Sequence, residues 1–346
     1  MHSERAIYID VGAGIMILWM IVGHAVYAAS SVEILQGESC HLKGINYFIP
    51  NCLFFFMPWF FYKSGQFFKK KNLRDEWKKD SQKLLRPFLT WSGIGFILYV
   101  ITQISDQTLT LRSVTYDVLR GLFIAGNIQL NTPLWFLLTL FIVRQIANYL
   151  LPRDDDGFYW PKSVLVILGG YGIAFGAYCY NCPILPLWIG NGTAGLAFFA
   201  LGYCMHKCEK KWWLVVPCAL CYVVLCVLGF PNYDMRSNWC GNAMIYLVNL
   251  PACFAGIVTF NMLCRLISTY ATNVSIPFEI IGKYAMIIYV SHGLIFESIR
   301  RLIPCLDIFE SISFTIVFWI IMGAYVVLLP LFCYFDYLSH ERIRKT

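Results

Sequence analysis

Long apolar runs alternate with short polar connections along the whole chain. Several runs approach or exceed the roughly 18 apolar residues that mark a helix able to cross a bilayer. The pattern predicts an all-α fold, namely a polytopic membrane protein built as a bundle of ten transmembrane helices. The predicted spans are about 9–29, 46–68, 88–105, 134–151, 163–179, 184–205, 212–229, 243–267, 276–296 and 312–337.

The distribution of positive charge predicts the orientation of these spans. Of the 27 Lys and Arg residues, twenty lie at the two termini and around the even-numbered junctions, counted as residues 69–86, 144–162, 207–211 and 265–283, whereas the odd-numbered junctions hold six. The remaining cation, Lys63, lies inside a predicted span. Because cytoplasmic loops carry an excess of positive residues, we expect both termini to be cytoplasmic. An odd number of spans would not produce this alternation.

The composition excludes several classes of protein. The 346 residues are 58% hydrophobic and only 14% charged, unlike a soluble domain, and they lack the short alternating segments of a β-barrel. The net charge of +7 indicates no nucleic-acid partner, because the cations cluster in particular loops, as membrane topology requires. The first span is too long for a cleavable signal peptide. Without a linker or an internal repeat, residues 1–346 are expected to form a single transmembrane domain.

The chain contains 14 cysteines, most of them inside apolar runs, where cysteine behaves as a small hydrophobe. Cys179 and Cys182 form a C-x-x-C pair, which can be interpreted as two incidental thiols or as part of a disulfide on the outer side. The cysteines that this topology places there are Cys40, Cys179, Cys182, Cys240 and Cys305. No spacing of His and Cys predicts a metal site.

The first span carries an ionisable side chain, His24, deep inside it, and another, Asp10, at its inner entrance. An ionisable group inside a membrane helix is costly and points to function. Since histidine exchanges protons near neutral pH, we interpret His24 as a general base. The eleven residues from Ala13 to His24 rise roughly 16 Å, so Asp10 is too far away to contact His24. The alternative is that His24 only joins two helices through a hydrogen bond.

Further candidates lie at both membrane surfaces. His292 lies at the depth of His24 on another helix and joins His24 and Asp10 as a catalytic candidate. At the inner side, Lys83 and Arg86 lie on one face of a helical turn and could hold phosphates, although positive-inside bias also explains them. At the outer side, Asn131 and Trp135 could contact a sugar, whereas an interfacial Trp more often belongs to an aromatic belt.

Six stretches, in this order, resemble acyltransferase family 3, the membrane proteins that O-acylate cell-surface glycans. Within the family the opening looks most like the fucose 4-O-acetylase-related group. The stretches are IDVGAGIMILWMIVGH, FFFMPWFFYKSG, KLLRPF, PLWFLLTLF, FFALGY and IGKYAMIIYVSH, which run from residue 9 to residue 292.

The resemblance implies an acyltransferase of the plasma (inner) membrane with no bound cofactor. It would move an acyl group, usually acetyl, from the cytoplasmic co-substrate acyl-CoA to a hydroxyl of a cell-surface or exported glycan. His24 matches the family's essential histidine, and Ser64 the serine of its F-x-x-S-G element. Lys83 and Arg86 match its R-x-x-R element, with Lys in place of the first Arg.

One departure from the family pattern is Ala13, where the family places Arg or Lys eleven residues before the histidine. We expect Lys63 to supply the missing charge and to join Ser64 in binding acyl-CoA. The alternative is that Lys63 only reaches toward the inner headgroups. Two other functions also remain open, namely a non-catalytic relative acting in glycan assembly, and a transporter or flippase with a His and Lys proton relay.

Overall fold

The computed structural model describes residues 7–35, 52–126, 131–153, 159–180, 187–206, 208–302 and 328. In these residues the regular structure is helical, apart from one isolated bridge between Asp234 and Trp239. The predicted all-α class is therefore confirmed for the described part of the chain. The predicted span 312–337 lies outside the described residues except for residue 328.

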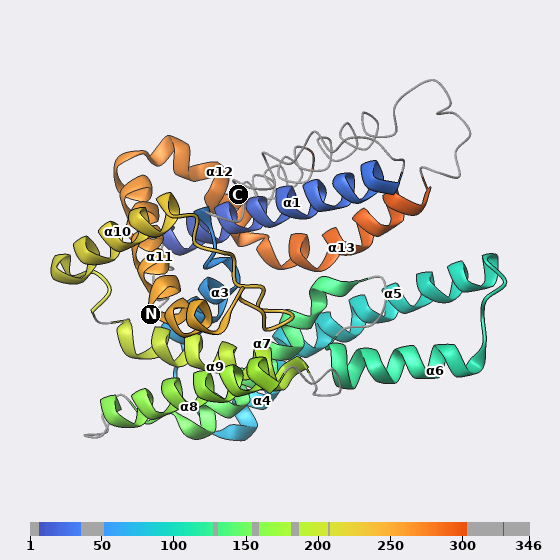
Figure 1. The fold of residues 1–346 in the computed structure, drawn as a ribbon, viewed down its shortest axis with the longest axis horizontal. Coiled ribbons are helices and arrows are strands. Elements are labelled where there is room, and N and C mark those ends of the chain that lie inside the picture. The colour runs from blue at the N-terminus through green and yellow to red at the C-terminus, as the bar shows by residue number, and fades with distance from the viewer. Residues whose placement is uncertain are drawn as a thin grey trace, which may run out of the picture. The chain divides into compact units, whose positions relative to one another are not determined.

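The helices follow one another along the chain as Figure 1 shows. The first half contains α1 (Ile7–Leu35), α3 (Phe56–Gln66), α4 (Leu73–Asp80), η1 (Ser81–Leu85), α5 (Arg86–Ser105), α6 (Leu111–Arg120), η2 (Gly121–Ala125), η3 (Thr132–Leu134) and α7 (Trp135–Leu150). The second half contains α8 (Tyr159–Tyr180), α9 (Leu187–Met205), α10 (Trp212–Val227), α11 (Ala243–Tyr270), α12 (Thr272–Lys283) and α13 (Ala285–Leu302).

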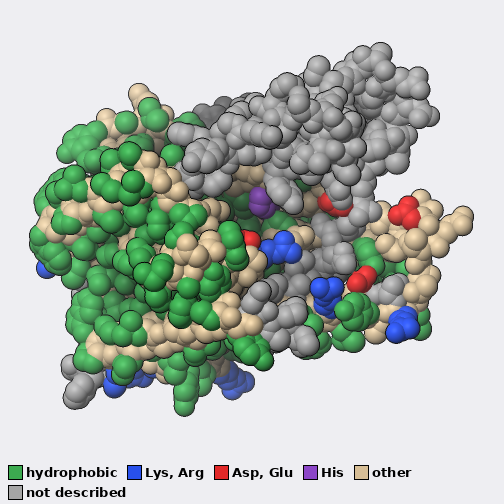
Figure 2. All heavy atoms as spheres, viewed as in Figure 1, with side chains coloured by type: hydrophobic (Ala, Val, Ile, Leu, Met, Phe, Trp, Pro, Cys, Tyr) green, Lys and Arg blue, Asp and Glu red, His purple; other side chains and the backbone are tan. Residues whose placement is uncertain are grey.

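Each predicted span up to residue 302 contains a helix, but the helices differ in length. Within the described residues, five helices are long and apolar enough to cross a membrane, or six if a bent pair counts as one span. That pair is α12 and α13, which meet at an angle of 68°. The predicted continuous span 276–296 is therefore broken at Tyr284. Exposed apolar side chains cover much of the face in Figure 2, as expected of lipid-facing helices.

The chain divides into two compact units. Unit 1 combines residues 1–52 with 259–346, and unit 2 comprises residues 53–258. In unit 1, α1 packs along α12 and also contacts α13. The backbones touch at two glycines, because a methyl group on Gly14 would lie 2.0 Å from the Phe278 carbonyl oxygen and one on Gly282 would lie 1.8 Å from that of Asp10. Small residues allow this close approach.

Unit 2 is organised around α9, which packs against α3, α7 and α8. The helices α3 and α9 cross in the same way as α1 and α12, through one glycine on each helix. A methyl group on Gly65 would lie 1.9 Å from the Phe199 carbonyl oxygen, and one on Gly202 would lie 2.0 Å from that of Tyr62. This close approach fixes Ser64 beside the crossing.

Candidate active site

The two histidines that the sequence places at one depth are in direct contact in unit 1. The Nδ1 atom of His24 lies 3.1 Å from Nε2 of His292, and the ring centroids are 5.1 Å apart. His24 comes from α1 and is exposed, whereas His292 comes from α13 and is fully buried. One partner of His24 is thus a side chain from another helix. The exposed ring of His24 therefore packs against the buried ring of His292.

The surroundings of His292 fix the positions of its protons. Its Nδ1 lies 2.6 Å from the Tyr289 carbonyl oxygen, which can only accept, so Nδ1 carries a proton. In the neutral ring, Nε2 then accepts the hydrogen bond that His24 donates from Nδ1. This tautomer places the basic lone pair of neutral His24 on Nε2, the nitrogen on the side away from His292.

Aromatic rings hold His292 in place. The ring centroid of Tyr289 lies 5.8 Å from that of His292, and Phe296 packs edge-on with a centroid distance of 5.7 Å. All three side chains lie on α13 at helical spacing. The buried ring is therefore fixed by packing as well as by its hydrogen bonds, and it holds His24 in one orientation.

Asp10 lies apart from the histidine pair, as the rise along the helix predicts. Its side chain is buried, with 1% exposure, at the point where its own carbonyl oxygen faces Gly282. Nearby on α1, the Tyr8 hydroxyl accepts a hydrogen bond of 2.8 Å from Arg265, and the guanidinium carbon lies 4.0 Å from the Tyr8 ring centroid. Arg265, on α11, is therefore a cation beside α1.

A buried charge cluster in unit 2 surrounds Ser64. Arg144 of α7 donates from Nε to Asp80 Oδ2 at 2.9 Å, from Nη2 to Glu76, and from Nη1 to Ser64 Oγ at 3.3 Å. Gln145 adds a hydrogen bond of 3.0 Å to the same Asp80 oxygen. Glu76 and Asp80 are both almost fully buried. One guanidinium therefore joins α3, α4 and α7.

Sequence reasoning missed this cluster because it counted Arg144 only as one cation of a cytoplasmic connection. Two signals were available. Arg144 lies well inside the predicted span 134–151, and Glu76 and Asp80 are four residues apart, hence on one face of a helix. Neither signal identifies the partner, since Arg144 is 64 residues from Asp80 along the chain.

The other acyl-CoA candidates lie on the same unit. Lys63 is half-buried, and its Nζ lies 5.1 Å from the Trp59 ring centroid. Lys83 and Arg86 are exposed. Lys83 belongs to the π-helical turn η1 that precedes α5, so the α-helical spacing assumed for the pair does not apply there. Pro87 stands in the first turn of α5, where proline is favoured.

The candidates for acceptor binding are buried. Asn131 is fully buried and Trp135 is 5% exposed. Trp135 instead packs against Gly126, whose added methyl group would lie 3.6 Å from the Trp135 Cβ, and against the Phe136 ring. The interpretation of Trp135 as an exposed aromatic-belt residue is therefore wrong. Its role in acceptor binding stays a prediction.

The cysteines on the predicted outer side are thiols where the structure describes them. Cys179 and Cys240 are free, whereas Cys40, Cys182 and Cys305 lie outside the described residues. Burial raises the pKa of the Cys240 thiol to about 12. A thiol that resists ionisation is a poor nucleophile, so Cys240 is not suited to carry an acyl group.

Comparison with known proteins identifies the family. The family model described as an acyltransferase domain matches residues 6–335, which is most of the chain. The chain therefore belongs to acyltransferase family 3. In the same comparisons it matches no curated protein and no solved structure.

Proposed function

We propose that this acyltransferase moves an acyl group, acetyl in the first instance, from acyl-CoA to a hydroxyl of a cell-surface or exported glycan. The observation that supports this proposal most directly is the contact between exposed His24 and buried His292. The pair offers a base whose tautomer is fixed. The likeness of the opening stretch to the fucose 4-O-acetylase-related group favours a sugar hydroxyl as the acceptor.

In the proposed reaction, Nε2 of His24 takes the proton of the acceptor hydroxyl. The oxygen attacks the thioester carbonyl carbon, and the tetrahedral intermediate collapses with cleavage of the carbon–sulfur bond. The thiolate of CoA then receives the proton from His24, which restores the neutral ring. Such general-base assistance is worth typically 10²–10⁴-fold in rate. His292 accepts the Nδ1–H hydrogen bond of His24 throughout, so it acts on the orientation of the base.

Acyl-CoA binding is assigned to Lys63, Ser64, Lys83 and Arg86, of which Lys83 and Arg86 are exposed. Exposed cations suit the phosphates of a soluble co-substrate. Ser64 has a different environment, because Arg144 donates a hydrogen bond to its Oγ. Asn131 and Trp135 are assigned to the acceptor.

The proposal includes the predicted topology. Ten spans with both termini cytoplasmic, in one domain of the plasma (inner) membrane, would expose the cationic connections to cytoplasmic acyl-CoA. The acyl group would then leave on the outer side. The charge alternation along the chain supports this orientation.

The test is acyl transfer from labelled acetyl-CoA by membranes that contain the full-length protein, with surface glycans analysed for acyl groups by mass spectrometry. We expect His24→Ala to lower transfer by roughly 10²–10⁴-fold, because it removes the base. The matched control is His206→Ala, since His206 bonds a backbone carbonyl at the end of α9, and it should keep wild-type activity. A His24→Ala protein that acylates glycans normally would contradict the mechanism.

Lys63 provides a second test, because Ala13 stands where the family has a cation. If Lys63 supplies that charge, Lys63→Ala abolishes acyl transfer without lowering the thermal stability of the protein. Lys63→Arg should then keep part of the activity. Full activity in Lys63→Ala would refute the charge substitution while leaving the histidine mechanism intact.

Ala13 also favours one rival, a non-catalytic relative that acts in glycan assembly. This rival predicts that His24→Ala and Lys63→Ala change nothing in glycan acylation, and that wild-type membranes transfer no label. The third function, a transporter or flippase, predicts a dependence on the proton gradient with no acyl transfer.

A further inference from the structure

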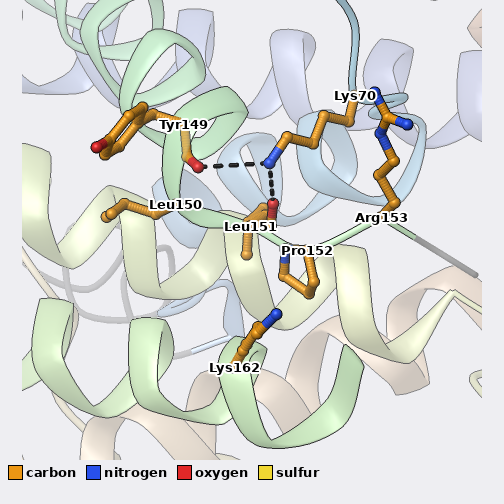
Figure 3. A pocket seen from close by; sticks show the side chains of 7 residues that line it. All are labelled: Lys70, Tyr149, Leu150, Leu151, Pro152, Arg153 and Lys162. Atoms are coloured by element: carbon orange, nitrogen blue, oxygen red, sulfur yellow. Dashed lines mark hydrogen bonds between the residues drawn. The ribbon is translucent and has the colours of Figure 1, made fainter. Parts of the chain in front are cut away.

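An open pocket of about 490 Å³ lies at the C-terminal end of α7 in unit 2. Figure 3 shows that it is formed by the connection after α3, the end of α7 with the residues that follow, and the first turn of α8. Its volume is within the range of small-molecule sites, roughly 300–1,000 Å³. The lining residues are Lys70, Tyr149, Leu150, Leu151, Pro152, Arg153 and Lys162.

The pocket is electropositive. Lys70, Arg153 and Lys162 all line it, and among the residues that the structure describes the lining includes no acidic side chain. The carbonyl groups at the end of a helix would normally repel an anion. Here the ammonium group of Lys70 covers them, at 2.6 Å from the Leu151 oxygen and 3.4 Å from the Tyr149 oxygen. Lys162 lies in the first turn of α8, the positive end of that helix.

Hydrogen bonds hold the walls of the pocket in place. The Asn148 side chain accepts from the Lys71 backbone amide at 3.0 Å and donates to the Lys71 carbonyl at 3.1 Å. The Tyr203 hydroxyl donates to the Pro152 carbonyl at 2.8 Å. These bonds join the connection after α3, the end of α7 and α9. A site that is formed before its ligand arrives loses less entropy on binding.

We propose that this pocket binds phosphate groups, and that the ligand is the nucleotide end of acyl-CoA. The inference rests on the proposed function and adds to it a donor subsite distinct from Lys83 and Arg86. The charge pattern predicts that residues 69–86 and 144–162 lie on the cytoplasmic side, where acyl-CoA is found. Lys and Arg are the side chains that hold phosphate through charge-assisted hydrogen bonds. A phospholipid headgroup offers the same chemistry.

The rival role for these cations is internal, because Asp154, Asp155 and Asp156 follow Arg153 directly in the sequence. Cations that serve only those carboxylates would contribute to stability and not to ligand affinity. The experiment therefore measures both quantities.

The full-length protein is reconstituted in phosphatidylcholine nanodiscs and titrated with CoA and with 3′-dephospho-CoA. The variants are Arg153→Gln, Lys162→Gln and the double variant. Lys70 is left unchanged because it also holds the end of α7. The matched control is Lys211→Gln, an exposed lysine in another connection predicted to be cytoplasmic. A second set of nanodiscs contains phosphatidylglycerol, and thermal unfolding is recorded for every variant.

Each single substitution should raise the Kd for CoA about three- to tenfold, and the double variant should multiply these effects. Raising the salt concentration should weaken CoA binding less in the double variant than in the wild type. Lys211→Gln should bind like the wild type. If instead phosphatidylglycerol competes with CoA, and its own binding is lost in the double variant, the phosphate is supplied by lipid.

The inference is overturned if the double variant keeps wild-type affinity for CoA and for phosphatidylglycerol. If the double variant then loses only thermal stability, the cations serve the neighbouring carboxylates and not a ligand. This failure is distinct from failure of the proposed function. A wild-type protein that transfers acetyl, while the double variant binds both CoA and phosphatidylglycerol normally, would refute the pocket only. A wild-type protein that neither binds CoA nor transfers acetyl would refute the proposal that acyl-CoA is the donor. In that case the pocket would remain only as a site for lipid phosphate, provided that phosphatidylglycerol binding depends on Arg153 and Lys162.

Discussion

The histidine pair of unit 1 and the arginine cluster of unit 2 show two ways of placing polar side chains inside an apolar bundle. His24 is exposed and rests on the buried ring of His292, so its surroundings fix its direction while its basic nitrogen faces away. Arg144 is bound by Glu76, Asp80 and Ser64 together. A charge engaged on several sides is suited to hold helices together, whereas an oriented and accessible base is suited to react.

Each site has one member on a helix that crosses another through reciprocal glycines, namely His24 on α1 and Ser64 on α3. In unit 1 the contact pairs residues four apart on each helix, Asp10 and Gly14 with Phe278 and Gly282. In unit 2 the spacing is three, with Tyr62 and Gly65 facing Phe199 and Gly202. In each unit, one glycine on either helix admits the carbonyl oxygen of the other. The backbone is thus held closely in both, and the difference between the sites comes from their side chains.

The largest effect on stability is expected from Arg144→Met. The substitution leaves Glu76 and Asp80 buried without their main counter-charge, and breaking a buried ion pair in this way costs about 3–5 kcal/mol. Thermal unfolding of the purified protein, followed by tryptophan fluorescence, measures the loss. The triple variant Arg144→Met, Glu76→Gln, Asp80→Asn removes the charges together and should recover most of the stability. A single variant as stable as the wild type would show that the cluster does not hold the helices.

Substitutions at the glycine crossings come next. Gly282→Ala and Gly202→Ala would place a methyl group 1.8 Å and 2.0 Å, respectively, from a backbone oxygen, much closer than van der Waals contact allows. The helices must therefore separate, at a cost of about 1–3 kcal/mol. Because the histidine pair lies in unit 1, the two variants should differ in their effect on activity. Gly282→Ala displaces α1 from α12 and should lower kcat, whereas Gly202→Ala should affect stability more than kcat.

The matched control for both is Gly172→Ala. Gly172 is exposed on α8, and an added methyl group would meet nothing within 4 Å. Alanine there should stabilise the helix by about 0.5–1 kcal/mol. Equal effects of Gly282→Ala and Gly172→Ala on unfolding would contradict the close crossing of α1 and α12.

The smallest effect is expected from His292. His292→Phe removes the acceptor for His24 Nδ1 and should lower kcat about tenfold while KM for acetyl-CoA stays unchanged, since a base that is slightly misplaced reacts more slowly. His292→Gln keeps an acceptor and should restore part of the rate. Steady-state kinetics of the two variants decide the point. A change in KM alone would show that His292 acts on substrate binding and not on the orientation of His24.

Local sequence patterns predicted the helices well. Hydrophobic runs located a helix in each predicted span up to residue 302, because burial in lipid requires every backbone group to bond within its own helix. The spacing from Ala13 to His24 correctly separated Asp10 from the base. The break at Tyr284 was not predicted, because the apolar run continues through it.

The sequence by itself determined the helical class, the acyltransferase family and the two histidines at one depth, since each depends on residues that are near in the chain or in a fixed order. Only the tertiary structure decided that Arg144 binds Glu76 and Asp80, that four glycines make two crossings, and that Lys70, Arg153 and Lys162 line one pocket. The reason is physical. Helical periodicity states which side of a helix a residue occupies, but the partner on that side is set by how whole helices pack, through contacts between residues far apart in the chain.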